Sequence, residues 1–319
     1  MSLSNTRVVI TRRLLRAWST EGGRSIKPGS SYNRASAFAI RRSQHRQHFT
    51  QFGLPTAFGV TGVAFGISLF GKADDPEETK KVDRTSKVEQ DVIKEADILY
   101  QAFIVPNLYK LLVRHADSTN PELLWRLARA TCEMAKQVGI SSADRTKFMY
   151  EAFEYAKKAL DFEPAHGNFA VHKWYAIMLN YVSEIEGTKA SLVNANEVRE
   201  HFEKAIQLNP ADPTSLHLLG LWHYTFADLP SYQRRLAAWV FASPPETTYE
   251  AALSLFEQAE RIQPDFYSKN HLYIGKCYQH LGDMDKAKHH LTRAADTPVV
   301  SPDDMDTHKE AQVLLKNMK

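Results

Sequence analysis

Four copies of one helix-forming block run through this chain, and their repetition constrains its fold more than any other feature. In the first copy, Ala152, Ala156 and Ala159 flank large apolar residues, and Pro164 follows. The remaining copies span 198–210, 252–264 and 287–298. Small residues let a neighbouring helix approach, the large apolar residue fills the space between the helices, and proline stops the helix. A chain built in this way stacks helices on one another.

The stretches ahead of the third and fourth blocks supply a matching first helix, marked by Leu216, Leu219 and Gly220 and by Ile274, Gly275 and Tyr278. A first helix of this kind followed by the block is typical of the tetratricopeptide (TPR) repeat. No stretch alternates apolar and polar residues for long enough to predict a sheet. The sequence therefore predicts an all-α fold, a TPR-like α-solenoid of about four to five antiparallel helix pairs. A stack of helix pairs is a surface for holding partners and has no reaction chemistry of its own.

The copies are unevenly spaced along the chain. Equivalent alanines at positions 159, 205, 259 and 294 lie 46, 54 and 35 residues apart, whereas a regular TPR array repeats about every 34 residues. The largest excess falls at 229–246, between the two helices of the third pair. This insertion contains an apolar run with paired arginines: Tyr232, Arg234, Arg235, Trp239 and Phe241. We expect a short inserted helix there, packed onto the array.

The N-terminal part of the chain differs in charge from the rest. Residues 1–73 contain eleven Lys or Arg, nine of them Arg, and one acidic residue, Glu21. Of the chain's 40 basic and 37 acidic residues, 29 and 36 therefore remain in 74–319, which carries a net charge near −7. The segment 7–18 would form a helix with an apolar face and an arginine face. A basic leader over 1–50 on an acidic body indicates mitochondrial targeting and argues against a nucleic-acid partner. A disordered basic tail is the alternative.

An apolar segment follows the leader. Residues 52–71 contain no charge, and a helix of twenty residues spans about 30 Å, the thickness of a bilayer's hydrocarbon core. Gly59, Gly62 and Gly66 would lie on one side of that helix, where small residues permit close helix packing in lipid. We expect a membrane anchor at 52–71, with a flexible apolar linker as the alternative. The charged stretch 72–85 then reads as a solvated linker.

Helix-capping residues divide the rest of the chain, 86–319, into helices. Ser86 and Glu89 have the spacing of a capping box at the start of the body, and Thr247 and Glu250 repeat it later. Asn120 precedes Pro121, and Asp212 precedes Pro213, which predicts a cap followed by a first-turn proline. We expect helices over 121–138, 214–227, 248–262 and 303–318.

Motifs for catalysis, phosphate binding and metal binding are missing from the sequence. The zinc-protease, phosphate-loop, dinucleotide and serine-hydrolase patterns do not occur. His289 and His290 are adjacent on a helix and point to different faces, so they cannot share a metal ion. Cys132 and Cys277 stand alone and read as small buried apolar residues in a reducing setting. The sequence predicts a protein that is not an enzyme, without cofactor or metal.

Partner binding would use the groove formed by the first helices. In a TPR pair the second, fifth, ninth and twelfth positions of the first helix face the groove, and Ala128, Ala176, Gly220 and Gly275 stand at position eight. The predicted groove residues are Arg129, Lys173, Asn180, His217, Leu221, Tyr224 and Lys276. This polar and aromatic set suits a peptide or an amphipathic ligand. The alternative is that some of them pack beneath the insertion.

Several runs of residues resemble one known family. They are 122–130, with Leu124, Trp125 and Arg126; 172–176; 201–206; 222–227; 232–235; 241–250; and 265–270. Over roughly 86–296 the chain resembles the regulator of microtubule dynamics proteins, most of all the member with a mitochondrial-type leader. The insertion motif is not shared by TPR proteins in general. The turn at 102–105, Ala-Phe-Ile-Val, departs from the polar, Gly- and Glu-rich turn of the family, so the first helix pair is expected to pack differently.

The resemblance implies a function in addition to a fold. It implies association with microtubules, directly or through a microtubule-associated protein, and with spindle poles and mitotic spindle organisation. It also implies a mitochondrial pool beside a cytoplasmic one. A related family member resembles a membrane-contact tether that holds phospholipid in its helical cup. Phospholipid binding or transfer at mitochondrial membrane contacts is therefore the alternative function.

Overall fold

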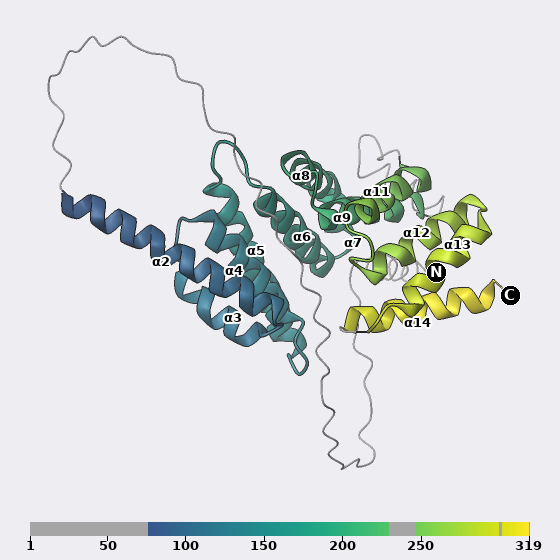
Figure 1. Ribbon diagram of the computed structural model, residues 1–319, viewed down its shortest axis with the longest axis horizontal. Helices are drawn as coiled ribbons and strands as arrows, with labels where there is room; N and C mark the ends of the chain where they lie inside the picture. The colour runs from purple at the N-terminus through teal and green to yellow at the C-terminus, as the bar shows by residue number, and fades with distance from the viewer. Residues whose placement is uncertain (1–75, 230–246, 300–301, 319) are drawn as a thin grey trace, which may run out of the picture. The chain divides into compact units, whose positions relative to one another are not determined.

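The computed structural model describes residues 76–229, 247–299 and 302–318 (Figure 1), with only the backbone described at 76–86 and 302. Residues 84–319 belong to one compact unit. Of the second unit, 23–83, the structure describes only the first residues of a helix. The predicted leader at 1–50, the predicted anchor at 52–71 with Gly59, Gly62 and Gly66, and the insertion residues Tyr232, Arg234, Arg235, Trp239 and Phe241 lie outside the described residues.

All elements in the described part of the chain are helices. They are α2 (Pro76–Gln101), α3 (Val105–Leu112), η1 (Val113–His115), α4 (Pro121–Ala135), α5 (Ser142–Asp161), α6 (Phe169–Glu186), α7 (Thr188–Val193), α8 (Ala195–Leu208), α9 (Pro213–Ala227), α11 (Tyr249–Ile262), α12 (Ser268–Leu281), α13 (Met284–Asp296) and α14 (Pro302–Asn317). Four pairs pack together: α4 with α5 (pair one), α6 with α8 (pair two), α9 with α11 (pair three) and α12 with α13 (pair four). Helices α2 and α3 precede them, and α14 follows (Figure 1). The all-α, TPR-like array of helix pairs is confirmed.

The repeated small residues bring the two helices of each pair together. Ala152, Ala156 and Ala159 of α5 are at most 1% exposed. A Cβ atom added to Gly220 of α9 would lie 2.9 Å from the ring of Phe256 in α11. The large apolar residue of one helix therefore occupies the space that the missing side chain of the other leaves open. This contact explains why the block and its glycine-bearing first helix occur together.

The predicted caps are mostly in place. The Asn120 side chain accepts a hydrogen bond from the Glu122 backbone N–H at 2.9 Å, and Asp212 accepts one from Ser215 N–H at 2.9 Å. In pair three the cap lies one residue later than predicted: the Thr248 hydroxyl accepts from Ala251 N–H. The Thr247 hydroxyl instead lies 2.6 Å from Nδ1 of His223, so it is not available to cap the helix.

Helix α2, which precedes the four pairs, begins earlier than the capping-box pattern predicts. Helix α2 starts at Pro76 and passes through Ser86, so Ser86 is an interior residue and not a cap. Residues 76–85, expected to be linker, contain Glu, Lys and Arg and have proline only in the first turn. These residue types favour a helix, and an N-terminal proline does not oppose one. The charged residues of this segment therefore belong to a solvated part of the helix and do not mark a linker.

The turn between α2 and α3 contains the residues that depart from the family pattern. Phe103 has a φ of 56° and is 77% exposed. The N–H of Ile104 donates to the carbonyl of Leu99 at 3.0 Å, which closes the turn. A left-handed backbone costs about 1–2 kcal/mol for a residue other than glycine. The position thus favours glycine, and this chain places an exposed phenylalanine there. That the first helix pair packs differently from the family's stays a prediction.

The unequal repeat spacing has a visible cause in pair two. Helix α7, a single short helix, lies between α6 and α8 and accounts for the long spacing between the first two blocks. The larger excess in pair three falls at 230–246, so the inserted helix predicted there lies outside the described residues. Cys132 and Cys277 are both 0% exposed and unpaired, as expected of small apolar core residues.

Candidate partner-binding groove

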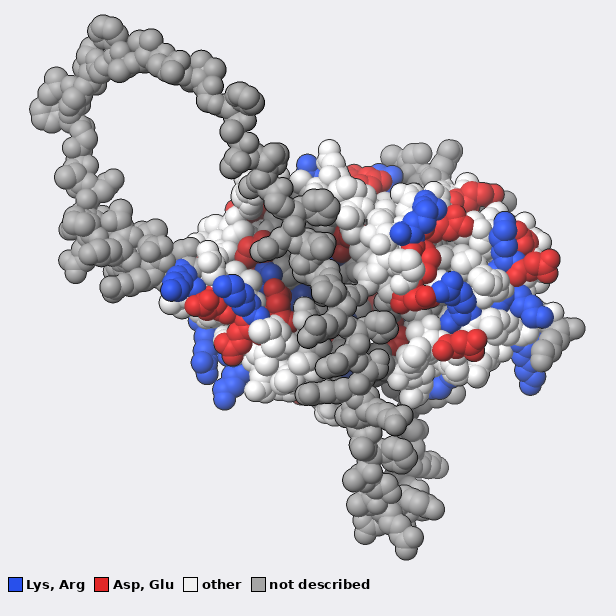
Figure 2. All heavy atoms as spheres, viewed as in Figure 1, with Lys and Arg blue, Asp and Glu red and all other residues white. Residues whose placement is uncertain are grey.

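The first helices of successive pairs form one face of the array. Helices α4 and α6, α9 and α12, and α12 and α14 are in direct contact, and Lys173 of α6 is hydrogen-bonded to Asp212, which caps α9. Therefore α4, α6, α9, α12 and α14 follow one another along what we call the first-helix face. On the side of the molecule shown in Figure 2, basic and acidic side chains of the described residues are interspersed and do not form a patch of one sign.

At the N-terminal end of this face, Arg129 is held by α2. Its Nη2 donates to Oδ1 of Asp97 at 3.1 Å, and its guanidinium lies 3.6 Å from the ring centroid of Tyr100. Arg126 binds the same carboxylate through Nε at 3.0 Å and Nη2 at 2.7 Å. Burial alone would raise the pKa of Asp97, but the two arginines outweigh it and hold that pKa below its usual value. The buried Nε of Arg129 has no hydrogen-bond partner.

Two predicted groove lysines are tied to the next first helix. Lys173 of α6 donates from Nζ to both carboxylate oxygens of Asp212, at 3.1 and 3.0 Å, and Asp212 caps α9. Lys276 of α12 donates to Oε1 of Glu310 in α14 at 2.8 Å and lies 4.7 Å from the ring centroid of Tyr273. Each lysine therefore joins two consecutive first helices and keeps part of its side chain in solvent.

The centre of the face contains a carboxyl group without an ion pair among the described residues. Asn180 donates from Nδ2 to Oε1 of Glu184 at 2.8 Å. Burial raises the pKa of Glu184 to about 8, against the opposing effect of that hydrogen bond. Both side chains line a pocket of about 30 Å³ where α6, α7, α8 and α9 meet, together with Trp222 and Thr225. This volume holds roughly two water molecules.

Three of the predicted groove residues are core residues in the structure. His217, Leu221 and Tyr224 are 2%, 3% and 5% exposed. His217 lies 5.3 Å from the ring of Phe256, and its Nδ1 is 3.0 Å from Oδ1 of Asn270. Burial is the main reason that the pKa of His217 falls to about 4. These three side chains hold α9 against α11 and α12. Arg129 is also buried, at 8% exposed, so the groove prediction continues with Lys173, Asn180 and Lys276.

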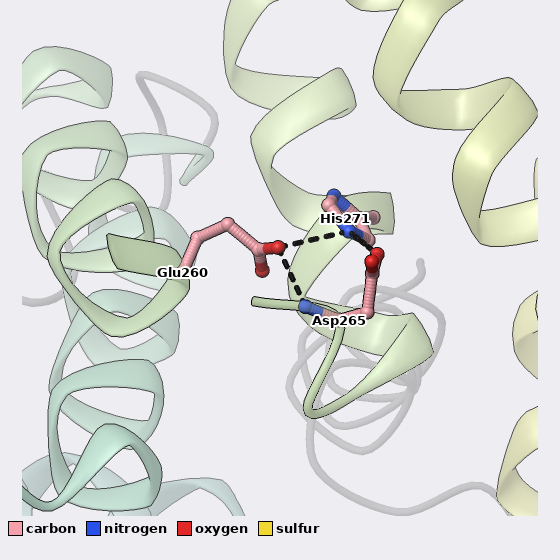
Figure 3. A group of neighbouring side chains, drawn as sticks. All are labelled: Glu260, Asp265 and His271. Carbon is pink, nitrogen blue, oxygen red and sulfur yellow. Dashed lines mark hydrogen bonds and ion pairs between the residues drawn. The ribbon is translucent and has the colours of Figure 1, made fainter. Parts of the chain in front are cut away.

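The structure brings together one cluster that sequence reasoning missed. Glu260 of α11, His271 of α12 and Asp265 in the turn between them converge (Figure 3). Nε2 of His271 lies 3.2 Å from Oε1 of Glu260 and 2.9 Å from Oδ1 of Asp265. Asp265 adopts a φ of 56°. The spacing of these residues follows no metal motif, and only the turn between the two helices brings them together.

The cluster has the ligand atoms of a metal site, but its oxygens already have partners. Arg293 donates from Nη2 to both oxygens of Asp265 at 2.5 Å. Glu260 accepts from the Asp265 backbone N–H at 2.8 Å and from Nδ2 of Asn270 at 3.2 Å. Hydrogen bonds from His271, among others, lower the pKa of Glu260 to about 2 although burial opposes them. A metal ion would have to displace Arg293, so we interpret the cluster as an ion-pair network that fixes the turn between α11 and α12.

Stacked helix pairs with partly exposed polar side chains on the first-helix face define a TPR-type helical-repeat protein. The sequence places it more closely: a family profile described as Regulator of microtubule dynamics protein 1-3 matches residues 92–319, and the chain belongs to that family. It is 47% identical over 234 residues to "Regulator of microtubule dynamics protein 1" of Pongo abelii, which is 73% of this chain and 74% of that protein. The human protein of that name is 49% identical over 191 residues, 60% of each chain.

More distant similarities extend in two directions. "Regulator of microtubule dynamics protein 2" of Mus musculus is 32% identical over 213 residues, 66% of this chain and 51% of that one. A solved structure of a thermophilic TPR protein from Thermus thermophilus covers 70% of this chain and 99% of its own, at 14% identity and a TM-score of 0.49. At this TM-score the fold assignment rests on the helix pairing described above. Within the described ranges, no helix is both long enough and apolar enough to cross a membrane.

Proposed function

We propose that this chain is a non-enzymatic helical-repeat protein that holds a protein partner on its first-helix face and thereby acts on microtubules. The observation that carries the proposal is the set of polar side chains left partly exposed on the first helices of two pairs. Lys173 and Asn180 come from α6 of pair two, and Lys276 comes from α12 of pair four. Membership of the microtubule-regulator family supports the choice of partner.

The charge of the body limits how it reaches a microtubule. Tubulin surfaces are acidic, and residues 74–319 carry 36 acidic and 29 basic side chains. Like charges oppose association at long range. Contact therefore needs either a local basic group, for which the paired Arg234 and Arg235 of the insertion are the candidates, or a basic partner protein that bridges the two acidic surfaces.

Co-sedimentation of the full chain with purified microtubules tests direct contact. At low salt we expect the chain to pellet, and an Arg234→Ala/Arg235→Ala variant to stay in the supernatant. Lys309→Ala, which removes one exposed basic residue from α14, is the matched control and should pellet as the unchanged chain does. If the unchanged chain remains in solution at low salt, direct binding is ruled out and the bridging partner remains.

The predicted anchor at 52–71 bears on where in the cell the protein would act on microtubules. A basic leader ahead of a moderately apolar, glycine-rich segment suits an outer-membrane anchor that leaves the body in the cytosol, where microtubules are. We propose this arrangement for a mitochondrial pool beside an unanchored cytoplasmic pool. External protease should then remove residues 74–319 from intact mitochondria. Protection until the outer membrane is ruptured would contradict it.

Phospholipid binding is the second candidate function. Among the described residues, the pocket of about 30 Å³ is too small for an acyl chain, and a larger hollow of about 520 Å³ is lined by Glu154, Lys157, Lys158 and Asp161 among others. The small pocket is apolar in part but cannot hold a lipid, and the larger hollow has four charged side chains beside Tyr155, Leu160 and Tyr175. The candidate therefore rests on the apolar insertion at 229–246. Mass spectrometry of the purified protein should recover bound lipid if this candidate is right, and lipid-free protein would leave the protein-partner function alone.

A further inference from the structure

Pair two contains two histidine rings in direct contact. Nδ1 of His172 in α6 lies 2.8 Å from Nδ1 of His201 in α8. The other nitrogen of His172, Nε2, lies 3.2 Å from Oε1 of Glu163, which follows α5. A neutral imidazole has one N–H and one bare nitrogen. A contact of this length between two Nδ1 atoms is a hydrogen bond only if one of them carries a proton and the other does not.

Pair four repeats the arrangement. Nδ1 of His271 in α12 lies 3.1 Å from Nδ1 of His290 in α13. Nε2 of His271 faces the carboxylates of Glu260 and Asp265. His271 is 1% exposed, so the contact is made inside the pair. In both pairs the histidine of the first helix has a carboxylate at Nε2 and the histidine of the second helix at Nδ1. We call these two histidines the first and the second ring.

The two histidine pairs occupy equivalent positions of the repeat. His172 and His271 each stand four residues before position eight of the first helix, and His201 and His290 each stand four residues before the last alanine of the block. The equivalent residues in pairs one and three are Leu124 with Tyr155 and Leu216 with Leu255. Pairs one and three therefore carry at this position no group that gains or loses a proton near neutral pH, and pairs two and four do.

The number of protons that the two rings can bind determines how these contacts respond to acid. With a carboxylate accepting from Nε2, the first ring of pair two presents a bare Nδ1 that accepts from the second ring. One added proton can enter at Nε2 of His201 and leave the contact intact. A further proton would have to enter at an Nδ1 atom, where the two N–H groups would face each other and the bond would be lost. Each pair therefore holds one proton fewer than two free histidines do in acid.

We propose that these two imidazole pairs are proton-operated latches: each joins the two helices of its pair only while the Nδ1 atoms share a single proton, so acid loosens pairs two and four at a contact that pairs one and three do not have. The latches thus make the solenoid sensitive to pH at every second pair. Loosening α6 from α8 or α12 from α13 would change the spacing of the first helices, on which Lys173 and Lys276 are carried.

The surrounding charges agree with this behaviour. Around the pair-two latch are Glu163 from the end of α5, and Glu197, Glu200 and Lys204 from α8 itself. Burial is the main cause that lowers the pKa of both His172 and His201.

Around the pair-four latch are Glu260 and Asp265, with His289 and Arg293 from α13. Burial, and then the neighbouring His271, lower the pKa of His290 to about 4. At the pair-two latch, Glu163 favours a proton on His172, and burial outweighs that effect.

Asparagine variants of the full chain test the latches. Asparagine places an amide where Nδ1 of histidine lies, so His201→Asn and His290→Asn keep a hydrogen-bonding group but remove the titration. Urea unfolding should show that the unchanged chain loses stability below the ordinary histidine pKa of about 6.5. Because each folded latch binds one proton fewer than the unfolded chain, it raises the unfolding equilibrium constant about tenfold for each pH unit below that value. Each single variant should remove one such tenfold factor, and the double variant should remove both.

His166→Asn is the matched control, because His166 is exposed in the turn after α5. It should leave the pH dependence as it is in the unchanged chain. If His201→Asn and His290→Asn also leave it unchanged, the latch proposal is wrong.

Nitrogen NMR of the histidine side chains tests the proposal without any variant. At neutral pH, one Nδ1 of each pair should be protonated and its partner bare, with a scalar coupling between them through the hydrogen bond. If both Nδ1 atoms of one pair are unprotonated and their NMR signals shift when a chelator is added, the pair is a metal site instead. Two protonated Nδ1 atoms at neutral pH would mean that no proton is shared. Either of these results overturns the proposal.

Discussion

At the N-terminal end of the first-helix face, in α4, charged side chains are held by the preceding helix, whereas from α6 onward they are held by the following one. Asp97 of α2 receives both Arg126 and Arg129 of α4. From α6 onward the direction reverses: Lys173 binds the residue that caps α9, and Lys276 binds α14. The difference teaches that α2 and α14 are not accessory helices. Each supplies the carboxylates that neutralise one end of the array.

The two halves also differ at position eight of the first helix. In the N-terminal half Ala128 and Ala176 occupy it, and in the C-terminal half Gly220 and Gly275 do. A Cβ at Gly275 would lie 2.7 Å from Cγ of Leu291 and 3.1 Å from the backbone oxygen of Ala287. The C-terminal pairs are therefore packed too closely for even the smallest side chain.

The largest expected effect is at the N-terminal end. Asp97→Asn takes away the carboxylate that Arg129 contacts and leaves Arg126 with Glu122 alone, and both arginine side chains are about one tenth exposed. Breaking a buried ion pair costs about 3 kcal/mol or more, and we expect a loss of about 3 kcal/mol because Asp97 itself is 37% exposed. Urea unfolding measures it. Asp91→Asn, which removes an exposed carboxylate of the same helix, should change the stability by less than about 0.5 kcal/mol. Equal effects of the two variants would show that α2 is not tied to α4 through Asp97.

The next largest effect should come from acid acting through His217 in the C-terminal half. The pKa of His217 is lowered to about 4, so the folded protein keeps this ring neutral while the unfolded chain binds a proton below about 6.5. The stability that His217 contributes is present above that value and is lost as the pH falls towards 4. Between pH 7 and pH 5 we expect a loss of about 2 kcal/mol from this residue. Stability measured against pH for His217→Asn should lack this component, and hydrogen exchange should weaken first between α9 and α12. An unchanged pH profile would contradict the assignment.

Exchanging the residues at position eight should have a smaller effect. Gly275→Ala gains about 1 kcal/mol of helix propensity but overpacks the contact with α13, which costs about 1–3 kcal/mol. We expect a net loss of about 1 kcal/mol by thermal or urea unfolding. Ala128→Gly, the reverse change in the N-terminal half, should also cost about 1 kcal/mol, through helix propensity alone. A stabilising Gly275→Ala would show that Leu291 and α13 can move aside.

The smallest effect belongs to the exposed end of the C-terminal half. Lys276→Met removes the ion pair with Glu310, whose side chain is 46% exposed. Exposed pairs contribute about 0.2–1 kcal/mol, so we expect a loss of about 0.5 kcal/mol that disappears in high salt. Stability in low and in high salt measures this. A loss of several kcal/mol that persists in high salt would mean that α14 depends on this one contact.

Much of the fold could be predicted because the repeat acts locally. The alanines at 152, 156 and 159 and the pair Gly220 and Phe256 are short-range pattern elements, and each maps to a contact within one helix pair. The prediction was less successful where polar groups had two uses. The capping-box pattern predicts Thr247 as a cap, and in the structure Thr247 contacts His223 instead. The same pattern predicts a helix start at Ser86, although the charged residues before it are helical. A local pattern does not reveal which of two hydrogen-bond partners is near.

By itself, the sequence determined that this chain is all-α, that its helices come in TPR-like pairs, and that its family is that of the microtubule regulators. Those properties depend on residues a few positions apart, which one helix or one turn brings together. Only the tertiary structure decided which groove positions are open. It buried His217, Leu221 and Tyr224 and brought His172 to His201 and His271 to His290. The reason is physical: the burial and protonation of a side chain depend on neighbours from other helices, and those distances are set by the packing of whole pairs.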